Sequence, residues 1–66
     1  MNDDMLKGKW KQLSGGIKEQ WGKLTDDTLT QIDGSREKFV GKLQELYGYT
    51  KEQAENAVDE YMKKMR

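Results

Sequence analysis

The sequence contains no cysteine, no histidine and no proline. Disulfides are therefore excluded, and zinc, haem and iron–sulfur centres lack the thiolate and imidazole ligands that usually bind them, so we expect no cofactor. The absence of cysteine also suits a reducing compartment. No run of apolar residues is longer than two, which predicts neither a transmembrane helix nor a signal peptide. We therefore expect a cytoplasmic protein.

An excess of charge of one sign is also lacking, because 12 basic residues balance 12 acidic ones. Nucleic-acid binding depends on the neutralisation of phosphates, so this balance disfavours a dedicated nucleic-acid-binding protein. A chain of 66 residues is long enough for one small domain, which we assign to residues 1–66. A core of this size contributes only about a few kcal/mol of net stability, and neither a disulfide nor a metal adds to it.

The most regular pattern in the sequence is the spacing of its glycines. Six of the seven glycines form two triplets with a step of seven residues: Gly8, Gly15, Gly22 and Gly34, Gly41, Gly48. The triplets are 26 residues apart, and the same offset pairs Leu13 with Phe39, Ile17 with Leu43, Trp21 with Tyr47 and Ile32 with Val58. A fixed period with matching apolar positions predicts one helical unit used twice. The shared core is expected to contain the bulky residues Trp10, Trp21, Phe39, Leu43, Tyr47 and Val58.

The first unit carries one apolar stripe with helical spacing. Its members recur every three or four residues and lie within about 60° of Trp10 on a helical wheel. They are Leu6, Trp10, Leu13, Ile17, Trp21 and Leu24. The glycines of this unit fall on the opposite, polar side. We expect Gly15-Gly16 to kink or break the helix and Gly22 to cap its C-terminus.

Three capping residues predict where the other helices begin. Thr25, followed by two aspartates, starts a short helix that ends at Asp33-Gly34-Ser35. Ser35 then starts a third helix, whose glycines again lie opposite its apolar side. Thr50-Lys51-Glu52-Gln53 has the spacing of a capping box and starts a fourth. The expected fold class is all-α, with four short helices arranged as two similar helical hairpins.

A set of short motifs is distributed over most of the chain: Trp10-Lys11-Gln12, Gly15, Lys18-Glu19, the run from Trp21 to Asp27, Gly34, Gly41-Lys42, Gln44-Glu45 and Tyr47-Gly48. Together they resemble the CsbD-like family of small bacterial proteins linked to the general stress response. The run from Trp21 to Asp27 is the most specific part. The resemblance covers roughly residues 8–61 and implies four short helices in an array similar to SAM-domain-like folds.

The same resemblance implies cytoplasmic expression under stress and no established molecular activity. It implies no catalytic or binding residues. The sequence departs from the family at Ser14 and Gly16, where relatives usually have basic residues. This departure thins a positive cluster and lowers the expectation of nucleic-acid contact.

Lys7, Lys9 and Lys11 are the candidate binding residues, because they surround Trp10 in a basic and aromatic patch. Such a patch can bind single-stranded nucleic acid by stacking bases on the indole. The alternative, which we favour, is that Trp10 belongs to the core and the lysines form a solvated rim. Residues 5–24 also have the amphipathic pattern of a helix that lies on an anionic membrane, but a stripe that faces a core has the same pattern.

Carboxylate pairs are present at two places. Asp26-Asp27 and Asp3-Asp4 are both explained as acids that favour the start of a helix, without a metal. No histidine or cysteine is available to activate a nucleophile, so we expect no enzyme activity.

Two mechanisms remain open for a non-enzymatic stress-response protein. One is a small hydrophilic protectant that acts by abundance, and the other is an adaptor that binds a specific protein partner. Self-association through Met62 and Met65 is a third route. Weak binding to nucleic acid or to a membrane surface is a further, disfavoured alternative.

Overall fold

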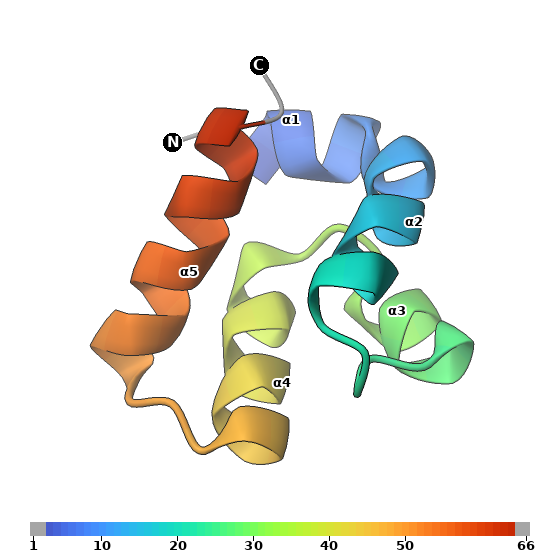
Figure 1. Ribbon diagram of the computed structural model, residues 1–66. Coiled ribbons are helices and arrows are strands. Elements are labelled where there is room, and N and C mark those ends of the chain that lie inside the picture. Colours follow the sequence, from blue (N-terminus) through green and yellow to red (C-terminus); the bar gives the residue numbers. More distant parts are fainter. Residues whose placement is uncertain (1–2, 65–66) are drawn as a thin grey trace.

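The computed structural model describes residues 3–64, and within this range the chain forms five helices and no strand (Figure 1). The helices are α1 (Asp3–Gly8), α2 (Trp10–Gln20), α3 (Asp26–Ile32), α4 (Arg36–Tyr47) and α5 (Lys51–Lys64). The all-α prediction is confirmed. One helix more than expected is present, because the first predicted helix is divided into α1 and α2. None of the helices within residues 3–64 has the length and apolarity needed to cross a membrane.

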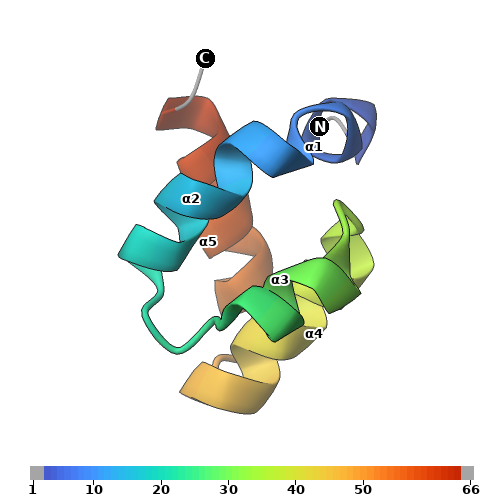
Figure 2. The ribbon, with the colours of Figure 1, turned by 90° about the vertical axis from the view of Figure 1, so that its right-hand side faces the viewer.

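The helices α4 and α5 form the most closely packed pair. They run side by side in opposite directions and are joined by a short connection of residues 48–50 (Figure 1). The short helix α3 packs on α4, and α1 packs on α2. Figure 2 shows α3 alongside α4, with α1 and α2 above them. The second unit is therefore a helical hairpin, whereas α2 and α3 are separated by the longer connection of residues 21–25.

The first predicted helix is interrupted at Lys9, and the prediction of a break at Gly15-Gly16 is wrong. α2 is continuous across both glycines. Lys9 has φ −111° and ψ 15° and makes no side-chain cap. Glycine permits a break but does not require one, and the surrounding packing decides where the chain turns. The turn at Lys9 lets Leu6 enter the core from a separate helix, where it is buried.

The three predicted helix starts are confirmed by their hydrogen bonds. The hydroxyls of Thr25 and Ser35 each accept a bond from the backbone N–H three residues later, at 3.2 and 3.3 Å. At the start of α5 the capping box is reciprocal. The Thr50 N–H donates to Gln53 Oε1 at 2.9 Å, and the Gln53 N–H donates to Thr50 Oγ1 at 3.1 Å. Each cap satisfies backbone donors that have no partner within the helix.

The C-termini of α2 and α4 differ. Gly48 ends α4 in the left-handed conformation, with φ 71°, and its N–H donates to Gln44 O. The equivalent prediction for Gly22 is wrong, because Trp21 is the C-cap of α2, with φ −125° and ψ 89°. The chain therefore leaves α2 in an extended direction and needs no left-handed residue there.

Gly34 is buried against α1, so its placement on a polar face is wrong. It follows the left-handed Asp33 and itself has φ 79°. A Cβ atom at this position would lie 2.6 Å from Lys7 Cα. Only a residue without a side chain fits where α1 crosses this turn. The prediction that Gly41 faces away from the core is confirmed, because nothing lies within 4 Å of a Cβ built there.

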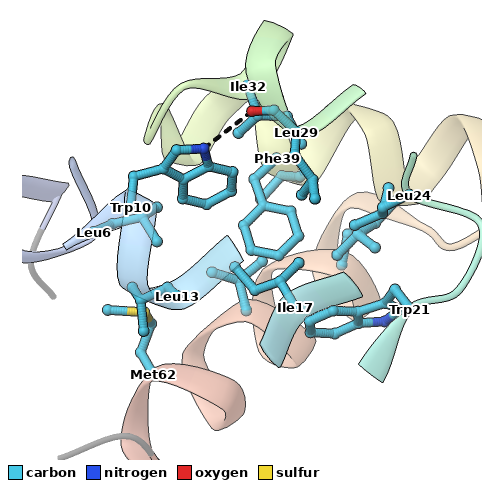
Figure 3. Close-up of a cluster of buried hydrophobic side chains, with 14 residues drawn as sticks. Leu6, Trp10, Leu13, Ile17, Trp21, Leu24, Leu29, Ile32, Phe39 and Met62 are labelled. Atoms are coloured by element: carbon cyan, nitrogen blue, oxygen red, sulfur yellow. Dashed lines mark hydrogen bonds between the residues drawn. The ribbon is translucent and has the colours of Figure 1, made fainter. Parts of the chain in front are cut away.

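Fourteen hydrophobic residues of the described chain form one buried cluster: Leu6, Trp10, Leu13, Ile17, Trp21, Leu24, Leu29, Ile32, Phe39, Val40, Leu43, Ala54, Val58 and Met62. Five of the six predicted core residues are among them, and Tyr47 is only partly buried. Phe39 lies between the two tryptophans (Figure 3), with ring centroids 5.8 Å from Trp10 and 5.4 Å from Trp21 in edge-to-face geometry. Such pairs stabilise a core beyond the area that they bury.

One ion pair connects the start of α4 to α5. Arg36 Nη1 lies 2.6 Å from Asp59 Oδ1. The angle does not satisfy hydrogen-bond geometry, so the contact is mainly Coulombic. Because the Asp59 side chain is about half exposed, water screens the pair and its contribution is less than about 1 kcal/mol.

Candidate functional site

The predicted patch of Lys7, Lys9 and Lys11 lies around the turn between α1 and α2, and all three side chains are exposed. Lys7 and Lys11 line one shallow groove of about 520 Å³, which we call the lysine groove, between these helices and α3. Lys9 is not part of its lining. The fold thus brings two of the three predicted residues to a common surface.

Trp10, the aromatic member of the patch, is a core residue. Its side chain is 8% exposed, and its indole Nε1–H donates to the carbonyl oxygen of Leu29 at 3.0 Å (Figure 3). The indole face is therefore not available for stacking with a nucleic-acid base. The interpretation of Trp10 as core, with lysines as a solvated rim, agrees with this geometry.

The opposite wall of the lysine groove is acidic. Asp26 from the first turn of α3 and Asp33 from its C-cap both line it. The Lys18 ammonium lies 2.9 Å from Asp26 Oδ1, in an exposed ion pair that connects α2 to α3. A phosphate that approached Lys7 and Lys11 would also meet these carboxylates. The groove consequently has mixed charge and lacks the continuous positive surface of a phosphate-binding site.

A second groove, of about 430 Å³, lies where the end of α2 approaches α5. Three aromatic and three carboxamide residues define what we call the aromatic–amide groove: Trp21, Tyr49, Tyr61, Gln20, Gln53 and Asn56. This site was not predicted from the sequence, because its residues are far apart in the chain and Trp21 was assigned to the core. The signal was available in α5, where Gln53, Asn56 and Glu60 recur at the spacing of one helical face.

Tyr61 links the two sides of this groove. Its ring centroid lies 5.4 Å from that of Trp21, at an interplanar angle of 56°. Its hydroxyl is directed at Gly16, where any side chain would collide with it. Burial raises the pKa of Tyr61 above the ordinary value of 10.0, and the negative charge of Glu19 adds to the rise. The phenol is therefore neutral at physiological pH and retains its hydrogen-bond donor.

Tyr47 holds the connection between α2 and α3 in place. Its hydroxyl accepts a hydrogen bond from the backbone N–H of Lys23 at 3.0 Å. The Lys23 ammonium lies 5.2 Å from the centroid of the Tyr47 ring and donates to Leu46 O at 3.4 Å. The Tyr47 ring also stacks with that of Tyr49, with ring centroids 5.7 Å apart. These contacts fix both Lys23 and the Tyr49 wall of the aromatic–amide groove.

The remaining predicted residues contribute no further site. Met62 is 5% exposed and belongs to the core, so its side chain offers no surface for self-association. Met65 and the side chains of Asp3 and Asp4 lie outside the described residues. Asp27 is exposed in the first turn of α3, as expected for an acid at a helix start.

Comparison with known proteins identifies close relatives. The sequence profile of the CsbD-like family matches residues 4–56. The chain is 54% identical to a UPF0337 protein of Protochlamydia amoebophila over 66 residues, which cover the whole of both chains. It is 58% identical to the UPF0337 protein YjbJ of Escherichia coli over 97% of this chain and 93% of that protein. It is 61% identical to a UPF0337 protein of Pseudomonas aeruginosa over 92% of this chain and 94% of that protein. No solved structure matches significantly.

Proposed function

Because the chain belongs to the CsbD-like family, we propose that it is a non-enzymatic stress-response protein that acts as a small hydrophilic protectant. Family membership suggests the association with stress. The mechanism rests on one observation: no polar or charged residue is buried among the residues whose side chains the structure describes, and the buried hydrophobic residues all belong to one cluster. The core buries most of the bulky apolar side chains, and the exterior of the described residues is rich in charged side chains.

This exterior carries both signs of charge, and the chain has no net charge at neutral pH. A surface of this kind is strongly hydrated and has no long-range preference for polyanions or polycations. Contacts with other macromolecules are therefore weak and numerous. Such a protein shields its neighbours in proportion to its concentration and needs no unique partner.

A titration of heat inactivation tests this mechanism. A reporter enzyme is heated with increasing amounts of the protein, and the residual activity is measured against an equal mass of an unrelated small globular protein. Protection should rise gradually, without a plateau near one chain per reporter. It should persist in a variant with alanine at Lys7, Lys9 and Lys11. Protection no better than that of the unrelated protein would refute the proposal.

An adaptor that binds one protein partner is the second candidate, and the aromatic–amide groove is the surface that favours it. A pull-down from stressed cells separates the two mechanisms. One stoichiometric partner, lost in Tyr49→Ala and retained in Gln31→Ala, would favour the adaptor. The absence of such a partner would favour the protectant.

Nucleic-acid and membrane binding have less support from the geometry. The apolar stripe of residues 6–24 faces the core instead of the exterior, and the lysine groove has an acidic wall. We expect no binding to single strands or duplexes above the non-specific level at physiological salt. A tight complex that weakens steeply with salt, and that the triple lysine variant loses, would contradict this expectation.

A further inference from the structure

The floor of the aromatic–amide groove is a set of rings held in fixed orientations. Trp21 and Tyr61 contact each other with centroids 5.4 Å apart. Tyr49 is held by its stack with Tyr47, at 5.7 Å and an interplanar angle of 29°. The exposed parts of Tyr49 and Tyr61 offer apolar surface that does not have to be ordered when a ligand binds.

Carboxamides form the rim of the same groove. Gln20 ends α2, and Gln53 and Asn56 lie on α5, all three with exposed side chains. Gln53 Oε1 is already bonded to the Thr50 N–H, which fixes this amide and leaves its NH₂ group as a donor. Each carboxamide offers both donors and an acceptor. A hydroxyl is also both donor and acceptor, so the rim matches a ligand that carries several hydroxyls.

The charge of the groove selects against ions. Glu60 and Lys64 are its charged lining residues, and they lie one helical turn apart with opposite signs. Their fields largely cancel for a ligand that spans both. The lysine groove differs, because two cations and two anions face each other across it. The charges of the aromatic–amide groove therefore add no net attraction for an anionic ligand. They also cause no net electrostatic penalty for a neutral ligand.

We propose that the aromatic–amide groove binds a neutral, polyhydroxylated ring compound of the size of a disaccharide. The apolar faces of the sugar rings pack against Tyr49 and Tyr61, and the ring hydroxyls bond to Gln20, Gln53 and Asn56. The volume of about 430 Å³ is within the range of small-molecule sites. Because the groove is shallow and solvent reaches the hydrogen bonds, the dissociation constant is on the order of millimolar. This binding does not depend on protectant activity, and either can fail without the other.

The two tryptophans provide an internal control in the unmodified protein. The indole of Trp21 lies at the groove, whereas that of Trp10 is bonded to Leu29 O at a different surface. In ¹⁵N-resolved NMR spectra, titration with maltose should shift the Trp21 indole and the side-chain amides of Gln20 and Asn56 until saturation. The Trp10 indole signal should not move. Equal movement of both indoles, or shifts that grow linearly without saturation, would overturn the proposal.

A matched pair of variants completes the test. Gln20 and Gln31 are both exposed glutamines in the last turn of a helix, but Gln31 lines a separate groove beside α4. Gln20→Ala should weaken maltose binding about 3- to 10-fold, which corresponds to the loss of a hydrogen bond. Gln31→Ala should leave it unchanged. The same loss in both variants would exclude this site. Saturable binding of an aromatic peptide, with none of maltose, would make the groove a protein-docking surface and would also refute the proposal.

Discussion

The first helices of the two units, α2 and α4, begin at residues 10 and 36, which are 26 residues apart. The second helices, α3 and α5, begin at residues 26 and 51, which are 25 residues apart. The offset changes at the connections, because α4 turns back through the left-handed Gly48 whereas α2 continues into an extended segment. The second helices also differ in length, with 7 residues in α3 and 14 in α5. The repeat is therefore conserved in the register of the first helices and lost where the chain reverses.

The aromatic residues that close α2 and α4 show what this difference does. Trp21 is 5% exposed and packs against Phe39 and Tyr61. Its counterpart Tyr47 is partly exposed and holds Lys23 in the connection of the other unit. Of these two equivalent positions, Trp21 therefore belongs to the core, whereas Tyr47 holds the connection between α2 and α3 in place.

The glycine pairs differ in the same way. Gly15 and Gly41 are both open positions within a helix. Gly8 has open space around it, whereas its counterpart Gly34 is pressed against Lys7. The seven-residue period therefore encodes no common packing role, because the surroundings of each glycine come from other parts of the chain.

The largest expected difference in stability is between the alanine variants of Trp21 and Tyr47. Trp21→Ala should cost about 3–5 kcal/mol, because it leaves a cavity beside Phe39, and this approaches the whole stability of a small domain. Tyr47→Ala should cost about 1–2 kcal/mol, from the hydrogen bond to Lys23 and partial packing. Thermal midpoints and helical circular dichroism measure both. Equal losses would mean that the two positions are equivalent after all.

Alanine substitutions at Gly34 and at Gly8 should differ in their effect on stability, by less than the substitutions at Trp21 and Tyr47 do. Gly34→Ala forces a side chain into a left-handed backbone and against Lys7, which should cost about 1–3 kcal/mol. Gly8→Ala meets open space and should be close to neutral. Denaturant midpoints of the two variants give the comparison. An unchanged midpoint for Gly34→Ala would show that α1 is displaced at little cost.

Alanine substitutions at Gly15 and Gly41, the two glycines with open space inside a helix, should stabilise the protein. Gly15→Ala and Gly41→Ala should each raise stability by about 0.4–1 kcal/mol, because alanine restricts the unfolded chain and nothing blocks its Cβ. Gly16→Ala is the contrasting variant, since its Cβ would collide with the Tyr61 hydroxyl, and it should lower the denaturant midpoint. The loss should be smaller in a Tyr61→Phe background. A loss of stability at Gly41 would contradict the open surroundings of this position.

The smallest expected effect is a dependence of stability on alkaline pH. Folding raises the pKa of Tyr61, so the folded state holds this proton more tightly than the unfolded state. The resulting stability is fully present below the ordinary value of 10.0 and is lost as pH rises through the raised pKa. Urea midpoints between pH 9 and pH 11 should fall in the wild type and in Tyr49→Phe, and fall less in Tyr61→Phe. The same decline of the urea midpoint in all three proteins would show that a group other than Tyr61 causes it.

The successful predictions concern local chemistry. Thr25, Ser35 and Thr50 start helices because a hydroxyl can bond a backbone N–H three residues later, whatever lies around it. The core followed from apolar spacing, since a helical stripe has to be buried somewhere. The wrong predictions concern where a helix ends or turns near glycine, because glycine permits several backbone conformations and does not select one. Nothing adjacent to Gly22 indicates that α2 would end without a left-handed residue, and nothing local singles out Lys9 as a turn.

The sequence by itself determined the all-α class, the three capped helix starts and most of the core, because hydrogen bonds within one turn and helical periodicity are local properties. Only the tertiary structure decided where α1 turns away from α2, which glycine must remain glycine and how Tyr61 meets Trp21. Those features depend on contacts between residues far apart in the chain, such as Lys7 with Gly34 and Gly16 with Tyr61. The aromatic–amide groove belongs to this second class, because its lining comes from residues 20–21 and from residues 49–64, which meet only when the chain folds.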